Sequence, residues 1–138
     1  MNTLISRNIF PEIVKYLYDP EILVIHGARQ VGKTSLMFFI RDYLIKAGKE
    51  TLFIDLEDFH FLEICNKSYK EVARYVEGKR GQQQERLFLF IDEIQYLENP
   101  SSFLKLLHDH YNEKIKLIVS GSSTFNIKSK FKNSLAGR

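Results

Sequence analysis

Short apolar runs recur along the chain, and each has the length and composition of a buried β-strand. They are rich in β-branched, leucine and aromatic residues, which is typical of strands covered on both faces. These runs lie at residues 21–26, 51–55, 87–91 and 115–119. Because segments of helical periodicity alternate with them, the sequence predicts an α/β fold, a mostly parallel sheet with helices on both faces.

The segments before and between the strands repeat apolar residues every three or four positions, as amphipathic helices do. Helices are expected at residues 9–18, 33–46, 68–78 and 100–111. Local signals mark their ends: Gly48 follows the second as a C-terminal cap, and Ser68 begins the third in a capping box with Glu71. Pro100, preceded by Asn99, starts the last helix at its first position.

The chain has the length and composition of one folded domain. Its 138 residues fit the usual size of a single domain, and 44% of them are hydrophobic, which excludes a disordered chain. Cys65 is the single cysteine, so an internal disulfide is excluded and a reducing compartment is indicated. We expect residues 1–20 to form a lead-in helix and residues 21–138 to form the domain core.

The sequence predicts neither export nor a membrane segment. Residues 1–11 lack the apolar stretch of a signal peptide, and the longest apolar runs, such as 87–91, fall far short of the roughly 20 residues that cross a bilayer. We therefore expect a cytoplasmic protein without membrane contact.

Positive charge is concentrated at the C-terminal end, although the net charge of the whole chain is only +3. Residues 114–138 contain six basic side chains and no acidic one, so this segment carries +6 and the remainder −3. The six are Lys114, Lys116, Lys128, Lys130, Lys132 and Arg138. Such a segment can contact phosphate groups. The alternative is a solvated or partner-facing end, which the interleaved apolar residues favour.

A glycine-rich motif connects the first strand to the helix that follows it. The motif reads Gly27-Ala28-Arg29-Gln30-Val31-Gly32-Lys33-Thr34, with Ser35 after it, and matches the phosphate-loop pattern G-x-x-x-x-G-K-[ST]. In such a loop the backbone N–H groups surround nucleotide phosphates, Lys33 bridges the β- and γ-phosphates, and the Thr34 hydroxyl ligates Mg²⁺. An ordinary glycine turn is the alternative, but the flanking strand and helix are the context that the motif requires.

Two adjacent carboxylates end the third apolar run, about 60 residues after the loop. Residues 87–91 followed by Asp92 and Glu93 match the Walker B pattern. The carboxyl ends of strands in an open α/β sheet are where ligands bind. Asp92 is therefore expected to hold Mg²⁺ through water, and Glu93 to act as the general base that orients the attacking water.

Further candidate residues follow the fourth strand and end the chain. Ser120 and Ser122 are candidates for hydrogen bonds to the γ-phosphate or to the attacking water, with an ordinary turn rich in serine and glycine as the alternative. Arg138 is a candidate arginine finger. The four histidines show no metal-ligand spacing, so no metal other than Mg²⁺ is expected.

Three features favour ATP hydrolysis over related phosphate-loop chemistries. A small-molecule kinase does not need an acid such as Glu93 beside the magnesium ligand. The strand at 51–55 lies between the two motifs in sequence, as in the additional-strand branch of phosphate-loop hydrolases. A GTPase would carry Asn-Lys-x-Asp, whereas the nearest string, Asn66-Lys67-Ser68-Tyr69, ends in tyrosine. We therefore expect ATP and Mg²⁺ as ligands.

Taken together, these motifs resemble the prokaryotic AAA-type ATPase family that has a G-x-R-Q-V-G-K-T loop. The strings that carry the resemblance are residues 27–34, Phe53-Ile54-Asp55-Leu56-Glu57-Asp58, Phe90-Ile91-Asp92-Glu93-Ile94-Gln95, Val119-Ser120-Gly121-Ser122-Ser123 and Leu135-Ala136-Gly137-Arg138. The resemblance covers nearly the whole chain and implies a P-loop NTPase three-layer sandwich of AAA type. Family members continue past the last string into more of the ATPase domain and a C-terminal domain often described as nuclease-like. The resemblance thus implies a chain truncated at the C-terminus, without the fifth strand and the C-terminal domain.

The sequence as a whole predicts Mg-dependent ATP binding and hydrolysis by an AAA-type ATPase. Two alternatives are left open: a nucleotide-gated interaction or nucleic-acid-binding module without turnover, and a small-molecule phosphotransferase. ATP is the expected partner. A homo-oligomer, and a DNA or protein partner bound through the C-terminal region of the family, are the further partners considered.

Overall fold

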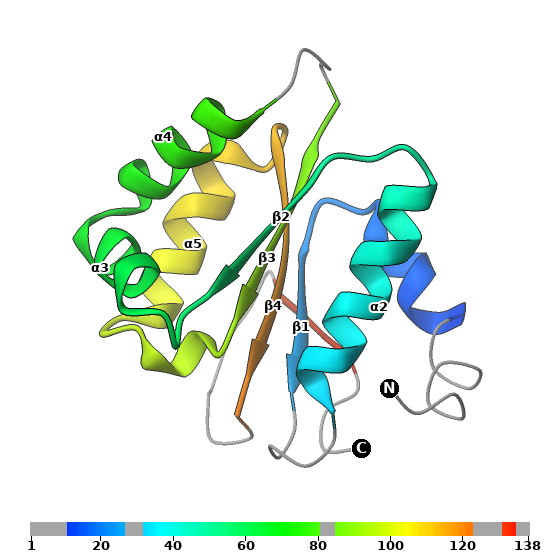
Figure 1. The fold of residues 1–138 in the computed structure, drawn as a ribbon, viewed down its shortest axis with the longest axis horizontal. Coiled ribbons are helices and arrows are strands. Elements are labelled where there is room, and N and C mark those ends of the chain that lie inside the picture. Colours follow the sequence, from blue (N-terminus) through cyan, green and yellow to red (C-terminus); the bar gives the residue numbers. More distant parts are fainter. Residues whose placement is uncertain (1–10, 27–31, 81–84, 123–130, 135–138) are drawn as a thin grey trace.

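The computed structural model describes residues 11–26, 32–80, 85–122 and the backbone of 131–134, and forms three layers with one sheet between two layers of helices (Figure 1). The strands are β1 (Ile22–His26), β2 (Thr51–Asp55), β3 (Leu87–Asp92), β4 (Ile115–Gly121) and β5 (Phe131–Ser134). The helices are α2 (Lys33–Lys46), α3 (Phe59–Lys67), α4 (Tyr69–Lys79), the 3-10 helix η2 (Ile94–Tyr96) and α5 (Pro100–Tyr111). Residues 11–17 form a further helix before β1, as predicted.

The sheet has the strand order β2-β3-β4-β1-β5, and every pair of neighbours is parallel. The expectation that the chain lacks a fifth strand is wrong, because β5 pairs with β1 from Ile22↔Phe131 to Ile25↔Ser134. β5 was missed because the string Phe131-Lys132-Asn133-Ser134 has no apolar run, and an edge strand needs none on its outer side. β2 separates the two motifs in sequence, but in the sheet it is the edge strand opposite β5. The strand between β1 and β3 in space is β4.

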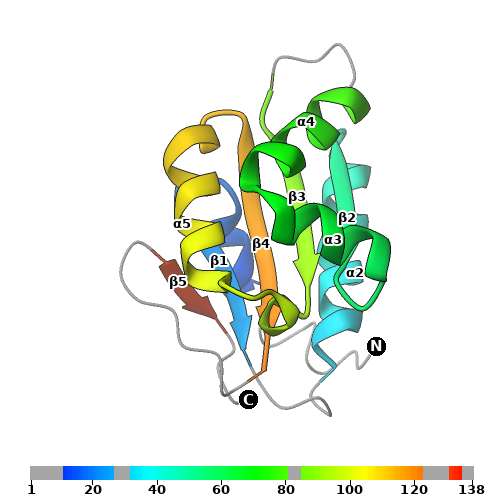
Figure 2. The ribbon, with the colours of Figure 1, turned by 90° about the vertical axis from the view of Figure 1, so that its left-hand side faces the viewer.

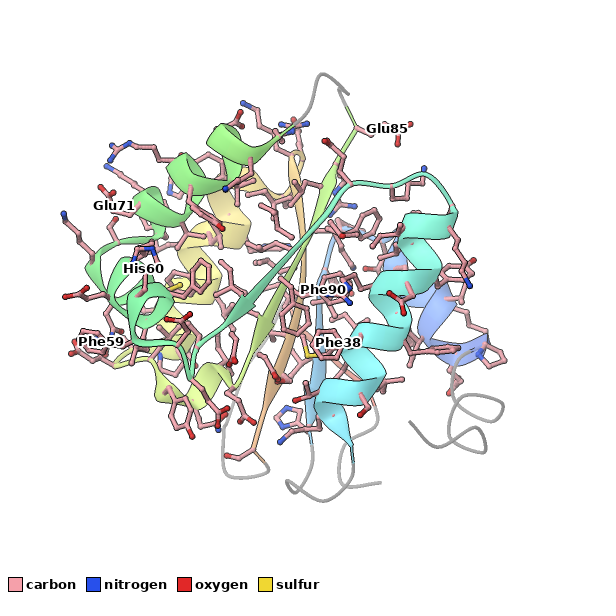
Figure 3. The ribbon with its side chains drawn as sticks, in the orientation of Figure 1. Phe38, Phe59, His60, Glu71, Glu85 and Phe90 are labelled. Atoms are coloured by element: carbon pink, nitrogen blue, oxygen red, sulfur yellow. The ribbon has the colours of Figure 1, made fainter. Side chains whose placement is uncertain are left out.

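Alternating side chains of the strands build one apolar layer on each face of the sheet. Ile22 and Val24 of β1 pack in the cluster that contains residues of α3, α4 and α5, while Leu23 and Ile25 pack with α2 and residues 11–17. Figure 2 shows α3, α4 and α5 together on one face of the sheet. Phe90 of β3 lies on the α2 face, as Figure 3 shows. The period of two in each strand therefore serves two cores, which is why the strands read as continuous apolar runs.

Local sequence signals explain where the helices begin and end. Gly48 adopts a left-handed φ of 81° after α2, and the N–H groups of Gly48 and Lys49 donate to the carbonyls of Ile45 and Leu44, as in a Schellman motif. Ser68 caps α4 as predicted, although its hydroxyl accepts from the N–H of Lys70 rather than from that of the capping-box glutamate.

Helix α3 was not predicted. Asp58 is its N-cap, and the Asp58 side chain accepts a hydrogen bond from the N–H of His60. Cys65 is its one buried residue, and Phe59 is exposed. With nine residues, α3 is shorter than α2, α4 and α5. The Asp58 cap was the signal that could have located it.

A buried ion pair anchors the entry to β1 at the amino end of the sheet. Lys116 of β4 is fully buried, and its ammonium donates to Asp19 Oδ1 at 2.8 Å, to the Asp19 carbonyl at 3.0 Å and to the carbonyl of Glu21. Burial lowers the pKa of Lys116, and the hydrogen bond that its ammonium donates to Asp19 opposes that shift. Lys116 therefore adds no charge to the surface of the basic segment 114–138.

Each helix within the described ranges is too short or too polar to cross a membrane.

Candidate functional site

The candidate site lies at the edge of the sheet where β1, β3 and β4 end and α2 begins (Figure 1). Gly32 is the N-cap of α2 and has a left-handed backbone, φ 73° and ψ 36°. A Cβ at Gly32 would meet no atom within 4 Å, so the backbone conformation, rather than space, favours glycine here. The first turn of α2 contains no acidic side chain, which leaves the positive end of the helix dipole uncompensated by its own residues.

Thr34 brings the start of α2 against the end of β3, directly after the buried Lys33. Lys33 is 3% exposed. The Thr34 hydroxyl donates a hydrogen bond of 2.8 Å to Asp92 Oδ2, although the two residues are 58 positions apart. The sequence motifs predicted this meeting, because both lie at the carboxyl edge of a parallel sheet.

Asp92 is held by hydroxyl groups on two sides. Its Oδ2 accepts from Thr34, and its Oδ1 accepts from the hydroxyl of Ser120 at the end of β4. Asp92 is 4% exposed and Ser120 is fully buried. Both oxygens of the Asp92 side chain therefore have a hydroxyl donor. The carboxylate and the Thr34 hydroxyl are hard oxygen ligands of the kind that Mg²⁺ takes from proteins, so these residues fit that ion.

Glu93 has a backbone conformation that is uncommon for its residue type. Its φ of 64° and ψ of 54° are left-handed, and among the described non-glycine residues it alone has a positive φ. The Glu93 N–H donates to Ser120 Oγ at 2.9 Å, which secures this conformation. Such strain costs of the order of 1–3 kcal/mol and clusters at functional sites. The left-handed backbone of Glu93 turns the chain from β3 into η2.

Gln95 is the residue of this site that sequence reasoning missed. Its side-chain Nε2 donates to Glu93 Oε1 at 2.6 Å, and its Oε1 accepts from the backbone N–H of Ser122 at 3.2 Å. Gln95 stands two residues after Glu93, but no local pattern predicts that its amide reaches the end of β4. The contact depends on the left-handed turn at Glu93, which periodicity does not encode.

The structure thus brings together most of the predicted site residues that lie within the described ranges. One hydrogen-bonded group contains Thr34, Asp92, Glu93, Gln95, Ser120 and Ser122. Gly32 and Lys33 lie at the side of this group where α2 begins. Ser35 is exposed on α2. The remaining predicted site residues lie outside the described ranges, and they are Gly27, Ala28, Arg29, Gln30, Val31 and Arg138.

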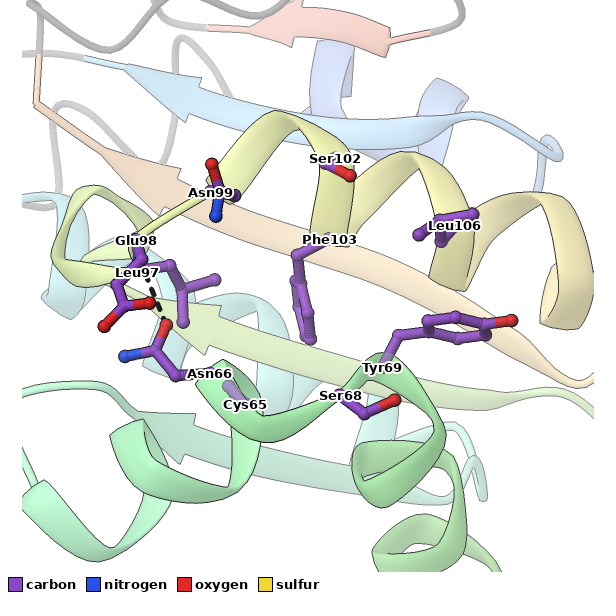
Figure 4. Close-up of a pocket in the computed structure, with 10 residues that line it drawn as sticks. All are labelled: Cys65, Asn66, Ser68, Tyr69, Leu97, Glu98, Asn99, Ser102, Phe103 and Leu106. Atoms are coloured by element: carbon purple, nitrogen blue, oxygen red, sulfur yellow. Dashed lines mark hydrogen bonds between the residues drawn. The ribbon is translucent and has the colours of Figure 1, made fainter.

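A cavity of about 280 Å³ lies apart from this group, between the α3–α4 junction and the segment from η2 to α5 (Figure 4). Asn66 Oδ1 accepts from the N–H of Glu98 across its wall at 3.0 Å. Cys65 is 3% exposed, and burial raises the pKa of its thiol to about 12. Cys65 is therefore a protonated packing residue and not a nucleophile.

The fold and the site define a class of protein. A parallel sheet of this order, with a helix starting at the end of β1 and a carboxylate pair at the end of β3, is the α/β fold of P-loop nucleoside triphosphatases. The sequence model of the family described as AAA domain matches residues 19–138. The chain therefore belongs to the AAA domain family, which confirms the resemblance and supports nucleotide binding.

Curated relatives match nearly the whole chain but are much longer. An uncharacterized protein of Haemophilus influenzae is 27% identical over 139 residues, which cover 98% of this chain and 34% of that protein. An uncharacterized protein of Methanocaldococcus jannaschii is 28% identical over 122 residues, which cover 88% of this chain and 26% of that protein. The chain thus spans about a third or less of the length of these two relatives.

Two solved structures share the fold at low sequence identity. The structure of C. elegans PCH-2 gives a TM-score of 0.55 at 14% identity, covering 96% of this chain and 38% of that one. A crystal structure of a DNA replication initiation factor gives a TM-score of 0.50 at 14% identity, covering 86% and 39%. This likeness shows the fold.

Proposed function

We propose that this AAA domain binds ATP with Mg²⁺ and hydrolyses it. The observation that supports the proposal best is the hydroxyl–carboxylate contact between Thr34 and Asp92, with the strained Glu93 directly after it. A structural acid would gain nothing from a left-handed backbone, whereas a group that must face a ligand beyond the strand end can require one.

In this proposal the phosphates bind to the N–H groups of residues 27–35 and to Lys33. Thr34 and Asp92 would hold Mg²⁺, which supplies charge neutralisation for the phosphates when bound. Lys33 is suited to this task because it stands at the start of α2 and is only 3% exposed. An ammonium removed from water interacts with a phosphate more strongly than an exposed one does.

Glu93 is proposed to take the proton of the attacking water and to fix that water in line with the phosphate. Ser120 is proposed to orient Asp92 and the Glu93 backbone, and Ser122 to contact the γ-phosphate or the water. Arg138 is proposed as an arginine finger supplied to a second copy of the chain.

We extend the proposal to the organisation of the chain. Residues 1–20 are a lead-in to a P-loop core that occupies residues 21–138, and the domain acts in the cytoplasm. A homo-oligomer is the assembly that a finger in trans would need. A DNA or protein partner would bind through regions that the longer relatives carry beyond this match.

The test measures ATP binding by calorimetry and phosphate release on the same preparations, with Mg²⁺ and with a chelator. Lys33→Ala should abolish binding, and Lys46→Ala, an exposed lysine of the same helix, is its matched control. Glu93→Gln should retain binding and stop turnover, with the exposed Glu63→Gln as its control.

Each outcome bears on a different part of the proposal. Unchanged affinity in Lys33→Ala would refute the phosphate loop. Equal loss of binding and turnover in Glu93→Gln would assign Glu93 to the metal or to the fold. Phosphate release that rises more than linearly with protein concentration would support the arginine in trans.

A further inference from the structure

The side-chain amide of Gln95 joins the segment that follows β3 to the end of β4. Its Nε2 lies 2.6 Å from Glu93 Oε1, and its Oε1 lies 3.2 Å from the backbone nitrogen of Ser122. Both polar ends of the amide are therefore used, one on β3's continuation and one on the end of β4. Gln95 itself is half-buried.

The two contacts fix which way round the amide lies. A carboxylate oxygen can only accept, so the amide nitrogen must face Glu93. A backbone N–H can only donate, so the amide oxygen must face Ser122. The contact with Glu93 is charge-assisted, which makes it the stronger of the two. A planar amide held at both ends transmits a displacement of one end to the other.

We infer that Gln95 is a positioning residue: it holds the Glu93 carboxylate in its working orientation and couples that orientation to the end of β4. This inference rests on the proposed role of Glu93 as the general base. Ser122 is proposed to contact the γ-phosphate or the water, so the position of its backbone depends on what occupies the site. Gln95 transmits a change in that position to the Glu93 carboxylate.

A second contact makes the coupling specific. Ser120 Oγ accepts from the Glu93 N–H and donates to Asp92, so β4 already fixes the Glu93 backbone. Without Gln95 the Glu93 carboxylate would keep its backbone position but lose its one described hydrogen-bond donor. The expected defect is therefore confined to the orientation of the carboxylate and spares the nucleotide contacts at Thr34 and Asp92.

The test compares three variants of the full chain. Gln95→Met keeps the length of the side chain and removes both hydrogen bonds. Gln95→Glu keeps an acceptor for the Ser122 N–H and replaces the donor that faces Glu93 by a carboxylate oxygen. Tyr96→Phe is the matched control, because it removes a hydrogen bond of the adjacent η2 residue to Glu57.

Turnover and affinity should separate in these variants. We expect Gln95→Met and Gln95→Glu to lower kcat for ATP hydrolysis by about tenfold or more, as a misplaced reacting group does. The KM and the calorimetric Kd for ATP should stay within about twofold of wild type, and Tyr96→Phe should match wild type in all three. A kcat of Gln95→Met equal to that of Tyr96→Phe, or a parallel loss of affinity, would overturn the inference.

Amide hydrogen exchange supplies a readout that does not depend on turnover. The Ser122 amide should exchange about fivefold faster in Gln95→Met, as expected for the loss of one ordinary hydrogen bond. It should keep its wild-type rate in Gln95→Glu and in Tyr96→Phe. An unchanged Ser122 rate in Gln95→Met would refute the bridge. Absence of phosphate release by wild type would instead refute the proposed function, so the two failures are distinguishable.

Discussion

Asp19 and Lys116 form a buried ion pair whose two members should contribute unequally to stability. The Lys116 side chain is 0% exposed and the Asp19 side chain is 25% exposed. Lys116 is thus cut off from water, whereas Asp19 is not. We predict that Asp19→Ala destabilises the fold more than Lys116→Met does, although both remove the same pair.

The magnitude follows from what each variant leaves behind. Asp19→Ala leaves a buried ammonium with two carbonyl acceptors and without its hydrogen-bonded carboxylate. Breaking a buried pair in this way costs about 3–5 kcal/mol. The cost has an upper bound, because Lys116 can lose its proton instead. From its ordinary pKa of 10.5, neutralisation at pH 7 costs about 5 kcal/mol. We therefore expect a loss of about 3–5 kcal/mol.

Lys116→Met should cost much less. Methionine fills most of the lysine volume, and the partly exposed Asp19 carboxylate can be hydrated once the ammonium is gone. The Asp19 carbonyl keeps a second donor, because Arg86 donates to it at 3.2 Å. The Glu21 carbonyl also loses the Lys116 donor, and the net loss of an ordinary hydrogen bond costs about 0.5–1.5 kcal/mol. We expect a loss of about 1–2 kcal/mol.

Urea denaturation at pH 7, followed by far-UV circular dichroism, measures both losses as shifts of the midpoint at constant slope. The double variant serves as the control, since it should resemble Lys116→Met rather than the sum of the two losses. Equal losses in the single variants, or a greater loss in Lys116→Met, would refute the reasoning from unequal exposure.

Four further predictions rest on other described features. Burial lowers the pKa of Lys116 in the folded chain below 10.5, so between the folded pKa and 10.5 the unfolded chain binds more protons than the folded chain does. The unfolding free energy of wild type relative to Lys116→Met should therefore rise with pH over this interval, and a falling difference in urea titrations would contradict the sign. Cys65 should resist a thiol reagent at pH 8 in the folded state and react at once in urea, since its pKa is about 12; its contribution to stability should then fall as pH rises from about 9 toward 12, and fast modification of folded protein would show that it is accessible. Gly48→Ala should lower the unfolding free energy by about 1–2 kcal/mol because of its φ of 81°, whereas Gly78→Ala, within helix α4 and equally free of close neighbours, should raise it by about 0.5–1 kcal/mol; thermal melts in which both change in the same direction would contradict this. Ser120→Ala should cost about 1–3 kcal/mol in thermal melts because it leaves the 4% exposed Asp92 with one donor fewer, and a cost below that of the surface control Ser101→Ala would show that the hydroxyl is dispensable.

The parts of the fold that could be predicted from sequence are those with a local cause. Continuous apolar runs predict the four strands, and a single glycine predicts the cap at Gly48; the structure confirms both. The meeting of Thr34 with Asp92 was also predictable, because a parallel sheet brings strand ends to one edge. β5 and α3 were missed because both are short: β5 has four residues at a sheet edge, and α3 has nine residues, one of them buried.

The unpredicted parts of the fold and of the site depend on contacts between distant residues. Lys116 and Asp19 are 97 positions apart, and in the sequence Lys116 is only one of several basic residues. Gln95 acquires its role through the left-handed turn at Glu93 and the arrival of Ser122 from β4. Residue spacing predicts neither the left-handed turn nor the proximity of Ser122 to Gln95. A polar residue near a predicted site is therefore informative only once the backbone has placed it.

β4 carries the buried ammonium near its amino end and the buried hydroxyl of the site near its carboxyl end, four residues apart. The acceptors of Lys116 on Asp19 and Glu21 lie just before β1, so the ammonium is satisfied in only one alignment of β4 beside β1. A slip by one residue would turn Lys116 into the opposite apolar layer and Ser120 away from Asp92. Lys116 thus favours the observed register of the central strand, the same register that places Ser120 beside Asp92.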